Sequence, residues 1–440
     1  MSESLIPLIT SRDEAALTGL LSRVHETEEW IGQAVEEILA DIRTRGLPAV
    51  LERTLQFDKA DLTAESFRVS EEEMEEAFRL ADPQVVQWLK EAEENIRRYH
   101  EKQKRTSWFD SREGILTGQL VRPLSRVGCY VPGGTASYPS SVLMTVVPAA
   151  VAGVSEIVVI SPPGPDGKLN PYTLVAARLA GATGVWKAGG AQAVGALAYG
   201  SGDLLPVDKI VGPGNIFVTV AKKQVYGQVD IDMLAGPSEI LVVADDSARA
   251  PYVAADLLSQ AEHDPLSSAV LITHSLDLAV EVREQLKMQL EKLSRQETAR
   301  QSLKNHSALV VTESLEESVS LANRFAPEHL ELCVRDPFSL LEEVKNAGAV
   351  FLGHYTPEPV GDYWAGPNHV LPTSGTARFY SPLNLDTYMK KISMVSMSRE
   401  ALLRDGHKIA GLADSEGLTA HAASVRIRLE KEDAEDGKSQ

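Results

Sequence analysis

Two adjacent side chains, Glu328 and His329, offer acid–base chemistry. They follow Pro327 in the segment RFAPEHLEL, so that a carboxylate and an imidazole stand side by side where a helix should end. Such a pair suits two proton transfers at separate positions. A helix cap or an ordinary surface position is the simpler alternative for either residue.

A second group of side chains could bind a divalent metal. Gln260 and His263 lie at positions i and i+3 near the end of a predicted helix, so both can point the same way. A pair of this kind is more often chance than a metal site. Further along, a long loop that begins at Gly361 contains Asp362 and His369 and shows little helical or strand pattern, which is typical of functional loops.

The last candidates lie near the C-terminus, where the segment ADSEGLTAH contains Glu416 and His421. Oxygen and nitrogen ligands without a thiolate suit a catalytic Zn²⁺ or Mn²⁺ with open positions for substrate better than a closed structural zinc site. Each residue could instead be a cap or a surface residue. The spacing alone does not show that these residues meet.

Three glycine-rich segments could bind a phosphate group. Residues 131–141, 189–195 and 212–215 each follow a predicted strand and lead into a predicted helix. Exposed N–H groups and the helix dipole at such a point favour an anion. None of the segments matches the G-x-G-x-x-G fingerprint of dinucleotide-binding proteins. The spacing therefore leaves open both a dinucleotide site and simple tight turns.

The elements that must position these residues alternate between strands and helices. The first hundred residues are predicted to be helical, and short β-rich runs separated by helices begin at about residue 125. This order predicts an α/β fold with two doubly wound parallel sheets, in which ligands bind beyond the carboxyl ends of the strands. The predicted strands are 126–131, 156–161, 184–189, 209–212, 239–245, 267–275, 307–313 and 347–353. Beyond residue 380 the β pattern fades into a helical segment and a tail, 431–440, whose composition predicts fraying.

Composition limits the kinds of partner. The chain has 440 residues and a net charge of −19, and no stretch is basic enough to bind nucleic acid. No run reaches the roughly 18 apolar residues of a membrane span, and the N-terminal segment lacks a signal-peptide pattern. The two cysteines, Cys129 and Cys333, fit core positions in a reducing compartment. A cytoplasmic protein with a small-molecule substrate is predicted.

The chain resembles the histidinol dehydrogenase family over nearly its whole length. The resemblance is carried by the following segments, which occur in the family's order: GCYVPGGTASYPSSVLM, GGAQAVGALAYG, KIVGPGN, DMLAGPSEILVVAD, LLSQAEHD, APEHLEL, VGDYWAGPNHVLPTSGTAR and SEGLTAHAASVRIR. It implies oxidation of L-histidinol to L-histidine through the aldehyde with two NAD⁺, the last steps of histidine biosynthesis.

The resemblance also implies a role for each candidate residue. Glu328 and His329 would be the catalytic acid–base pair. One Zn²⁺ per subunit, with Mn²⁺ as a possible substitute, would be held by Gln260, His263, Asp362 and His421. NAD would contact Tyr130, Gln192 and Asn215. The substrate would contact Ser238, His369 and Glu416, together with His329 and the four metal ligands.

The implied assembly is an intertwined homodimer in which Glu416 and His421 come from the partner subunit. The implied domains are two incomplete Rossmann folds with helical terminal segments. The first is discontinuous, 31–124 with 236–381, and the second is 125–235, with NAD contacts. Residues 1–30 would form an N-terminal helical arm, and residues 382–440 would reach the partner subunit.

Two other functions remain open at this point. A paralogue could keep the zinc and NAD chemistry and oxidise another small alcohol, such as a sulfonated diol. Glu328, His369 and Glu416 stand where histidinol dehydrogenase has them, which favours histidinol. A zinc hydrolase is the second alternative, since a carboxylate beside a metal also hydrolyses amides, but it would leave the glycine-rich segments without a role.

Overall fold

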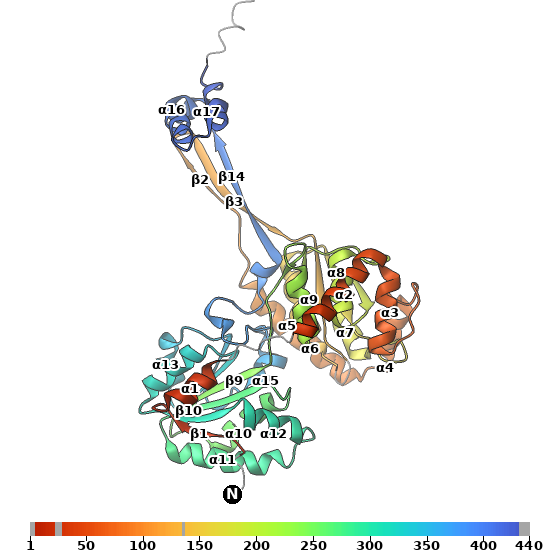
Figure 1. Cartoon of the computed structure of the whole chain (residues 1–440), viewed down its shortest axis with the longest axis vertical. Coiled ribbons are helices and arrows are strands. Elements are labelled where there is room, and N and C mark those ends of the chain that lie inside the picture. Colours follow the sequence, from red (N-terminus) through yellow and green to blue (C-terminus); the bar gives the residue numbers. More distant parts are fainter. Residues whose placement is uncertain (1–4, 23–28, 134–136, 431–440) are drawn as a thin grey trace, which may run out of the picture. The chain divides into compact units, whose positions relative to one another are not determined.

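The computed structural model describes residues 5–22, 29–133 and 137–430, and the chain forms two compact units (Figure 1). The first unit comprises Met1–Gln103 and Leu124–Tyr388, and the second comprises Lys104–Pro123 and Met389–Gln440. Residues 134–136 of the first glycine-rich segment and the tail 431–440 lie outside the described residues.

A six-stranded parallel sheet forms one half of the first unit. Its strand order is β1-β11-β10-β9-β12-β13. The strands are β1 (Leu8–Thr10), β9 (Glu239–Ala244), β10 (Ser268–Thr273), β11 (Ala308–Val311), β12 (His329–Cys333) and β13 (Ala349–Leu352). The central strands are buried along their whole length because helices cover both faces, which is the rule for parallel sheets.

Alternate residues of these strands face different helices. Ile240 and Val242 of β9 pack in the core on the side of α10–α12, whereas Leu241 and Val243 pack on the side of α1 and α13 (Figure 1). The helices are α1 (Glu14–Leu21), α10 (Ala250–Ala261), α11 (Leu276–Leu290), α12 (Gln296–Asn305) and α13 (Leu315–Phe325), followed by the short α14 (Pro337–Leu340) and α15 (Glu358–Val360).

A five-stranded parallel sheet forms the other half of the first unit. Its order is β6-β5-β4-β7-β8. The strands are β4 (Arg126–Tyr130), β5 (Glu156–Ser161), β6 (Gly184–Lys187), β7 (Lys209–Val211) and β8 (Asp230–Ile231). The helices that follow the strands are α6 (Pro139–Ala152), α7 (Pro171–Ala180), α8 (Gly190–Tyr199) and α9 (Ile216–Val225).

The N-terminal helices pack with the five-stranded sheet, which differs from the implied grouping of 31–124 with 236–381. The apolar stripe Ile31, Val35, Ile38 and Ile42 lies in the core beneath α8 and α9. These helices are α2 (Glu29–Arg45), α3 (Leu47–Asp58), α4 (Glu71–Leu80) and α5 (Pro83–Glu101), of which α4 packs on α7 and α5 on α6. An amphipathic stripe does not specify which sheet it covers, and this explains the difference.

The predicted α/β class with parallel sheets is confirmed, and each predicted strand is present. The implied helical arm 1–30 contains β1, which pairs in parallel with β11. The prediction that the β pattern fades beyond residue 380 was wrong, because β14 (Met389–Met397) forms there. Most residues of β14 are exposed, so it lacks the buried alternation that identifies a strand in sequence.

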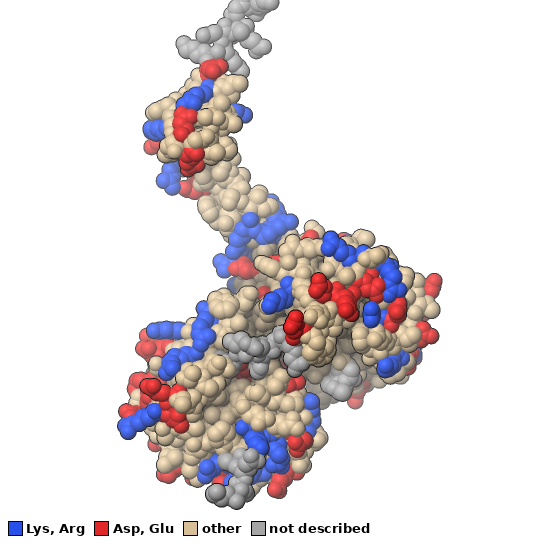
Figure 2. Space-filling view, in the orientation of Figure 1, with Lys and Arg blue, Asp and Glu red and all other residues tan. Residues whose placement is uncertain are grey.

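The second unit is an antiparallel sheet with two helices. The sheet has the order β14-β3-β2, and the remaining elements are β2 (Trp108–Arg112), β3 (Ile115–Pro123), α16 (Arg399–Ser415) and α17 (Thr419–Arg426). Among the described helices of both units, none has the length and apolar content needed to cross a membrane. On the face drawn in Figure 2, acidic and basic side chains are intermingled over much of the surface.

A buried ion pair fixes the loop after β7. Lys222 of α9 and Asp232 are 3% and 1% exposed, and their side chains pair directly. Lys222 Nζ also donates to Gly212 O at 3.0 Å, and Asp232 Oδ2 accepts from Gly212 N at 2.7 Å. Gly212 has φ +111°, and a Cβ there would lie 2.1 Å from Tyr130 O. Only glycine fits this close approach.

We expect Lys222→Met to destabilise the five-stranded half by about 3–5 kcal/mol, because Asp232 is left as an unpaired buried charge. Lys168→Met is the control, since Lys168 and Glu76 are 54% and 40% exposed and such pairs contribute about 0–1 kcal/mol. Urea unfolding followed by the fluorescence of Trp186, which is buried in this core, measures both. An equal loss in the free energy of unfolding for the two variants would contradict the prediction.

Candidate active site

The start of β12 holds Glu328 and His329 against the first residue of β9. Glu328 Oε2 accepts a hydrogen bond from Glu239 N at 2.8 Å, and His329 Nδ1 lies 2.8 Å from Glu239 O. Because a carbonyl oxygen only accepts, Nδ1 must be the donor, and in the neutral ring Nε2 is then the unprotonated nitrogen. Glu328 and His329 are 7% and 4% exposed. The geometry makes Nε2 the atom of His329 that takes up a proton.

Gly348 keeps this pair close to the neighbouring strand. Gly348 N donates to Pro327 O and Ala349 N donates to Glu328 O, both at 2.9 Å. A Cβ on Gly348 would lie 2.5 Å from Glu328 O. Glycine therefore permits the approach that fixes the backbone of Glu328.

A buried carboxyl group that the sequence did not single out, Glu358, faces His329. Its Oε1 lies 3.8 Å from His329 Nε2, which has no hydrogen-bond partner within the described ranges. Glu358 is 3% exposed, and its N–H donates to Glu331 Oε1 at 2.8 Å. In sequence it stands alone between Pro357 and Pro359, and no spacing connects it with His329.

The turn after Glu358 places the side chain of Asp362 next to His329 and Glu358. One ligand atom from each of His329, Glu358 and Asp362 lies within 4.8 Å of the others. Asp362 Oδ1 is also 3.6 Å from His369 Nδ1. His369 Nε2 lies 3.3 Å from Ser141 Oγ of α6. Residues far apart in sequence therefore converge on one cluster.

Gln260, at the end of α10, is suited to binding a ligand. It is 1% exposed, and its Oε1 is buried with no hydrogen-bond partner in the part of the chain that the structure describes. A buried amide oxygen in this state is unfavourable unless a ligand or a water satisfies it. His263 is exposed just beyond α10, and it lies close enough to affect the pKa values of His329, Glu358 and His369.

In the six-stranded sheet the cluster lies at the amino ends of β9 and β12, and not beyond the carboxyl ends of the strands, where the sequence led us to expect ligands. Ser238 directly precedes β9, and Glu328 directly precedes β12, its parallel neighbour. Helix α10 connects the carboxyl end of β9 with the amino end of its parallel neighbour β10. Gln260, near the C-terminal end of α10, therefore lies at the amino edge of the sheet. Ser238 is half-buried, and its carbonyl accepts from Ser268 N at 3.0 Å.

Glu416 and His421 belong to the second unit, whereas all other candidate residues belong to the first. Glu416 is the C-cap of α16 and His421 lies on α17, and both are exposed. The structure thus leaves these two side chains available on the surface of their own unit.

Burial dominates the electrostatics of the cluster. It raises the pKa of Glu328 well above the ordinary carboxyl range, that of Glu358 to about 8 and that of Asp362 to about 6. Burial also lowers the pKa of His329 and lowers that of His369 to about 4, so both imidazoles are neutral at pH 7. Clustered carboxyls, neutral imidazoles and an unsatisfied amide oxygen are the donor set that a divalent cation fits.

A cavity of about 410 Å³ adjoins the cluster. His329, Asp362 and His369 line it on one side, and Val350, Phe351 and Leu371 are among its apolar wall residues. A cavity of this size with both apolar and polar lining residues suits a small organic molecule.

The candidate cofactor residues lie at the carboxyl edge of the five-stranded sheet. Tyr130 ends β4, and its hydroxyl accepts from Gly190 N at 3.3 Å. Gln192 on α8 donates to Asp58 Oδ2 at 3.2 Å. Asn215 Oδ1 accepts from Phe217 N and Val218 N as the N-cap of α9. Tyr130 and Asn215 stand at the carboxyl ends of the neighbouring strands β4 and β7, and Gln192 lies in the first turn of α8. Tyr130 and Gln192 are buried, and the side chain of Asn215 is engaged as a cap.

Comparison with known proteins gives the family. The profile of histidinol dehydrogenase matches residues 21–429. The chain belongs to the histidinol dehydrogenase family. The histidinol dehydrogenase of Heliobacterium mobile is 58% identical over 398 residues, which cover 90% of this chain and 93% of that protein. That of Geobacter sulfurreducens is 53% identical over 419 residues, covering 94% and 97%.

A solved structure extends the likeness to the fold. The crystal structure of histidinol dehydrogenase from Elizabethkingia anophelis matches with a TM-score of 0.92 and 37% identity, covering 98% of this chain and 99% of that chain. Family membership places the protein among the oxidoreductases of histidine biosynthesis.

Proposed function

We propose that the protein oxidises L-histidinol to L-histidine through L-histidinaldehyde, with NAD⁺ as the hydride acceptor. The observation that carries this proposal is the arrangement of His329, whose Nδ1 is held by Glu239 O while Nε2, unpartnered among the described residues, lies 3.8 Å from Glu358 Oε1. Each turnover would use two NAD⁺ and one water and would release two NADH and three protons. Family membership supports histidinol as the substrate.

The acid–base pair would serve the two oxidation steps in turn. His329 Nε2 would accept the hydroxyl proton of histidinol as the first hydride leaves. Glu328 would then remove a proton from the water that hydrates the bound aldehyde. After losing its first proton, His329 would accept the hydroxyl proton of the hydrate as the second hydride leaves.

Gln260, His263 and Asp362, with His421 from a second copy of the chain, would hold one Zn²⁺, for which Mn²⁺ could substitute. The metal would anchor the imidazole and amine of the substrate, a template role that needs no redox chemistry. The buried, unsatisfied Oε1 of Gln260 supports this assignment. Ser238, His369 and Glu416 would complete the substrate contacts.

NAD would bind at the carboxyl edge of the five-stranded sheet through Tyr130, Gln192 and Asn215. Helix N-termini at this edge favour the pyrophosphate. We further propose a homodimer that acts in the cytoplasm, in which the second unit supplies Glu416 and His421 to the partner. The surface exposure of both residues on their own unit supports this assignment.

Stoichiometry tests the proposed reaction. Purified protein with limiting L-histidinol and excess NAD⁺ should form two NADH per histidinol, measured by absorbance. One NADH would indicate a simple alcohol dehydrogenase, and none would indicate a hydrolase or a binding protein. Chelation should abolish the activity, and Zn²⁺ or Mn²⁺ should restore it.

The rate should fall on acidification because of Glu328. Burial raises the pKa of this carboxyl, so the deprotonated form that acts as a base is lost at a pH above the ordinary carboxyl range. His329, with a lowered pKa, is already neutral there. The measurement is kcat/KM against pH with the metal site saturated. Glu328→Gln should lower kcat on the order of 10²–10⁴-fold. The kcat/KM that remains in this variant should no longer fall on acidification in the range where Glu328 takes up its proton. If kcat/KM of Glu328→Gln falls on acidification as in the wild type, Glu328 is not the group that causes the fall.

Complementation tests the shared site. His329→Ala and His421→Asn chains should each be inactive as homodimers. A heterodimer of the two has one intact site if His421 crosses to the partner, and should recover about half of the wild-type activity. Verified heterodimers without activity would show that each site uses its own chain's His421.

A further inference from the structure

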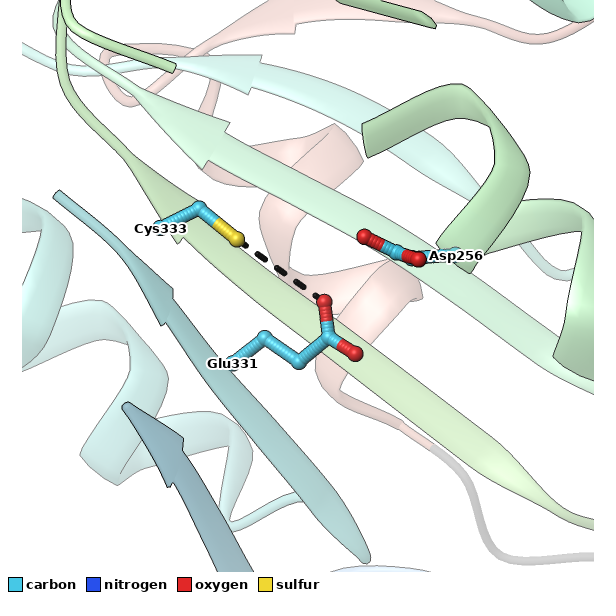
Figure 3. A group of neighbouring side chains, drawn as sticks. All are labelled: Asp256, Glu331 and Cys333. Carbon is cyan, nitrogen blue, oxygen red and sulfur yellow. Dashed lines mark hydrogen bonds between the residues drawn. The ribbon is translucent and has the colours of Figure 1, made fainter. Parts of the chain in front are cut away.

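A buried carboxyl pair, Asp256 and Glu331, lies outside the candidate site residues. Figure 3 shows Asp256 on α10 turned toward Glu331 and Cys333 of β12. Glu331 is 1% exposed and Asp256 is half-buried. The thiol of Cys333 lies 3.9 Å from Glu331 Oε2. Burying carboxyl groups is unfavourable unless each has a partner, so the contacts of this pair indicate its role.

The two carboxyl groups lie close together. One carboxyl oxygen of each lies within 4.8 Å of the other and of the Cys333 thiol. Burial raises the pKa of Asp256 to about 6 and that of Glu331 well above its usual range. Two such groups in contact cannot both be ionised in a buried site. The group that keeps its proton can donate to the other, which would join α10 to β12.

The other oxygen of Glu331 reaches a third element. Glu331 Oε1 accepts a hydrogen bond from Glu358 N at 2.8 Å, at the first residue of α15. A buried backbone N–H at this point needs an acceptor. Glu331 is the acceptor that the fold provides there.

Each of the three joined elements carries a residue of the candidate site. Helix α10 carries Gln260 one turn after Asp256. Strand β12 carries His329 two residues before Glu331. The segment that begins at Glu358 carries Asp362 in its next turn.

We propose that Asp256 and Glu331 are positioning residues that hold Gln260, His329 and Asp362 in register, an inference that rests on the proposed zinc and histidinol chemistry. The pair would act through these residues and would not touch the substrate. What matters in this role is the set of hydrogen bonds and not the charge. An amide in place of Glu331 should therefore succeed where an apolar side chain of similar size fails.

The test compares Glu331→Gln with Glu331→Met. Glutamine keeps an oxygen for Glu358 N–H and an N–H for Asp256, whereas methionine keeps the length and loses both bonds. Zinc affinity is measured by competition with a chelator, without histidinol or NAD⁺. We expect Glu331→Gln to stay within a few fold of wild type and Glu331→Met to lose on the order of 10–100-fold in zinc affinity and in kcat.

Cys333→Ala is the matched control, because it alters the same cluster without touching the bond to Glu358 N. It should leave zinc affinity unchanged. If Glu331→Met does not fold, as judged by circular dichroism, Asp256→Ala breaks the pair from the half-buried side. It should then lower zinc affinity by a similar factor.

Two results would overturn the proposal. One is a folded Glu331→Met, or Asp256→Ala in its place, with wild-type zinc affinity and kcat. The other is a Glu331→Gln that is as defective as Glu331→Met. Failure of the wild-type protein to form NADH from histidinol would instead refute the proposed function, because the zinc measurement does not depend on that substrate.

Discussion

The candidate site depends on one backbone unit, the first residue of β9. The N–H of Glu239 is bound by the carboxyl of Glu328, and its C=O is bound by the ring of His329, each at 2.8 Å. This is possible because β9 and β12 are parallel neighbours with His329 opposite Ile240. A slip of one residue would turn His329 to the opposite face of the sheet. Strand register therefore fixes the imidazole of His329, its tautomer and the neighbouring carboxyl of Glu328 together.

The electrostatics of the site follow from this placement. With the proton on Nδ1, the unprotonated Nε2 of His329 is buried and lies 3.8 Å from Glu358 Oε1. The same burial that keeps the imidazole neutral raises the pKa of Glu358 to about 8 and that of Asp362 to about 6. A cation in contact with these groups would favour their ionised forms and lower their pKa values. The neutral imidazole and the raised pKa values of the carboxyl groups thus have one physical origin, the burial of the start of β12.

Buried strands of β-branched residues were predictable from the sequence, and so was the α/β class. Strand β12 was harder to identify, because HLELC places His329 and Glu331 at alternate positions and reads as half-exposed, whereas all five residues are buried. Glu358 was missed because its contact with His329 joins residues 29 apart in sequence, and the nearby Asp362 alone does not identify it. The position of Ser238 and Glu328 at the amino edge also contradicted a general rule, since nothing local in sequence specifies which end of a sheet is used.

The alternation in β12 has a simple explanation in its two faces. Leu330 and Leu332 pack in the core on the side of α13. The opposite face presents His329 and Glu331, and each has specific partners: Glu239 O for the imidazole, and Glu358 N and Asp256 for the carboxyl. Polar side chains in a buried strand are unfavourable without such partners. Because alternate side chains of a strand lie on opposite faces, one strand can pack its apolar side chains in the core on one face. On the other face it can hold hydrogen-bonded polar side chains of the candidate site.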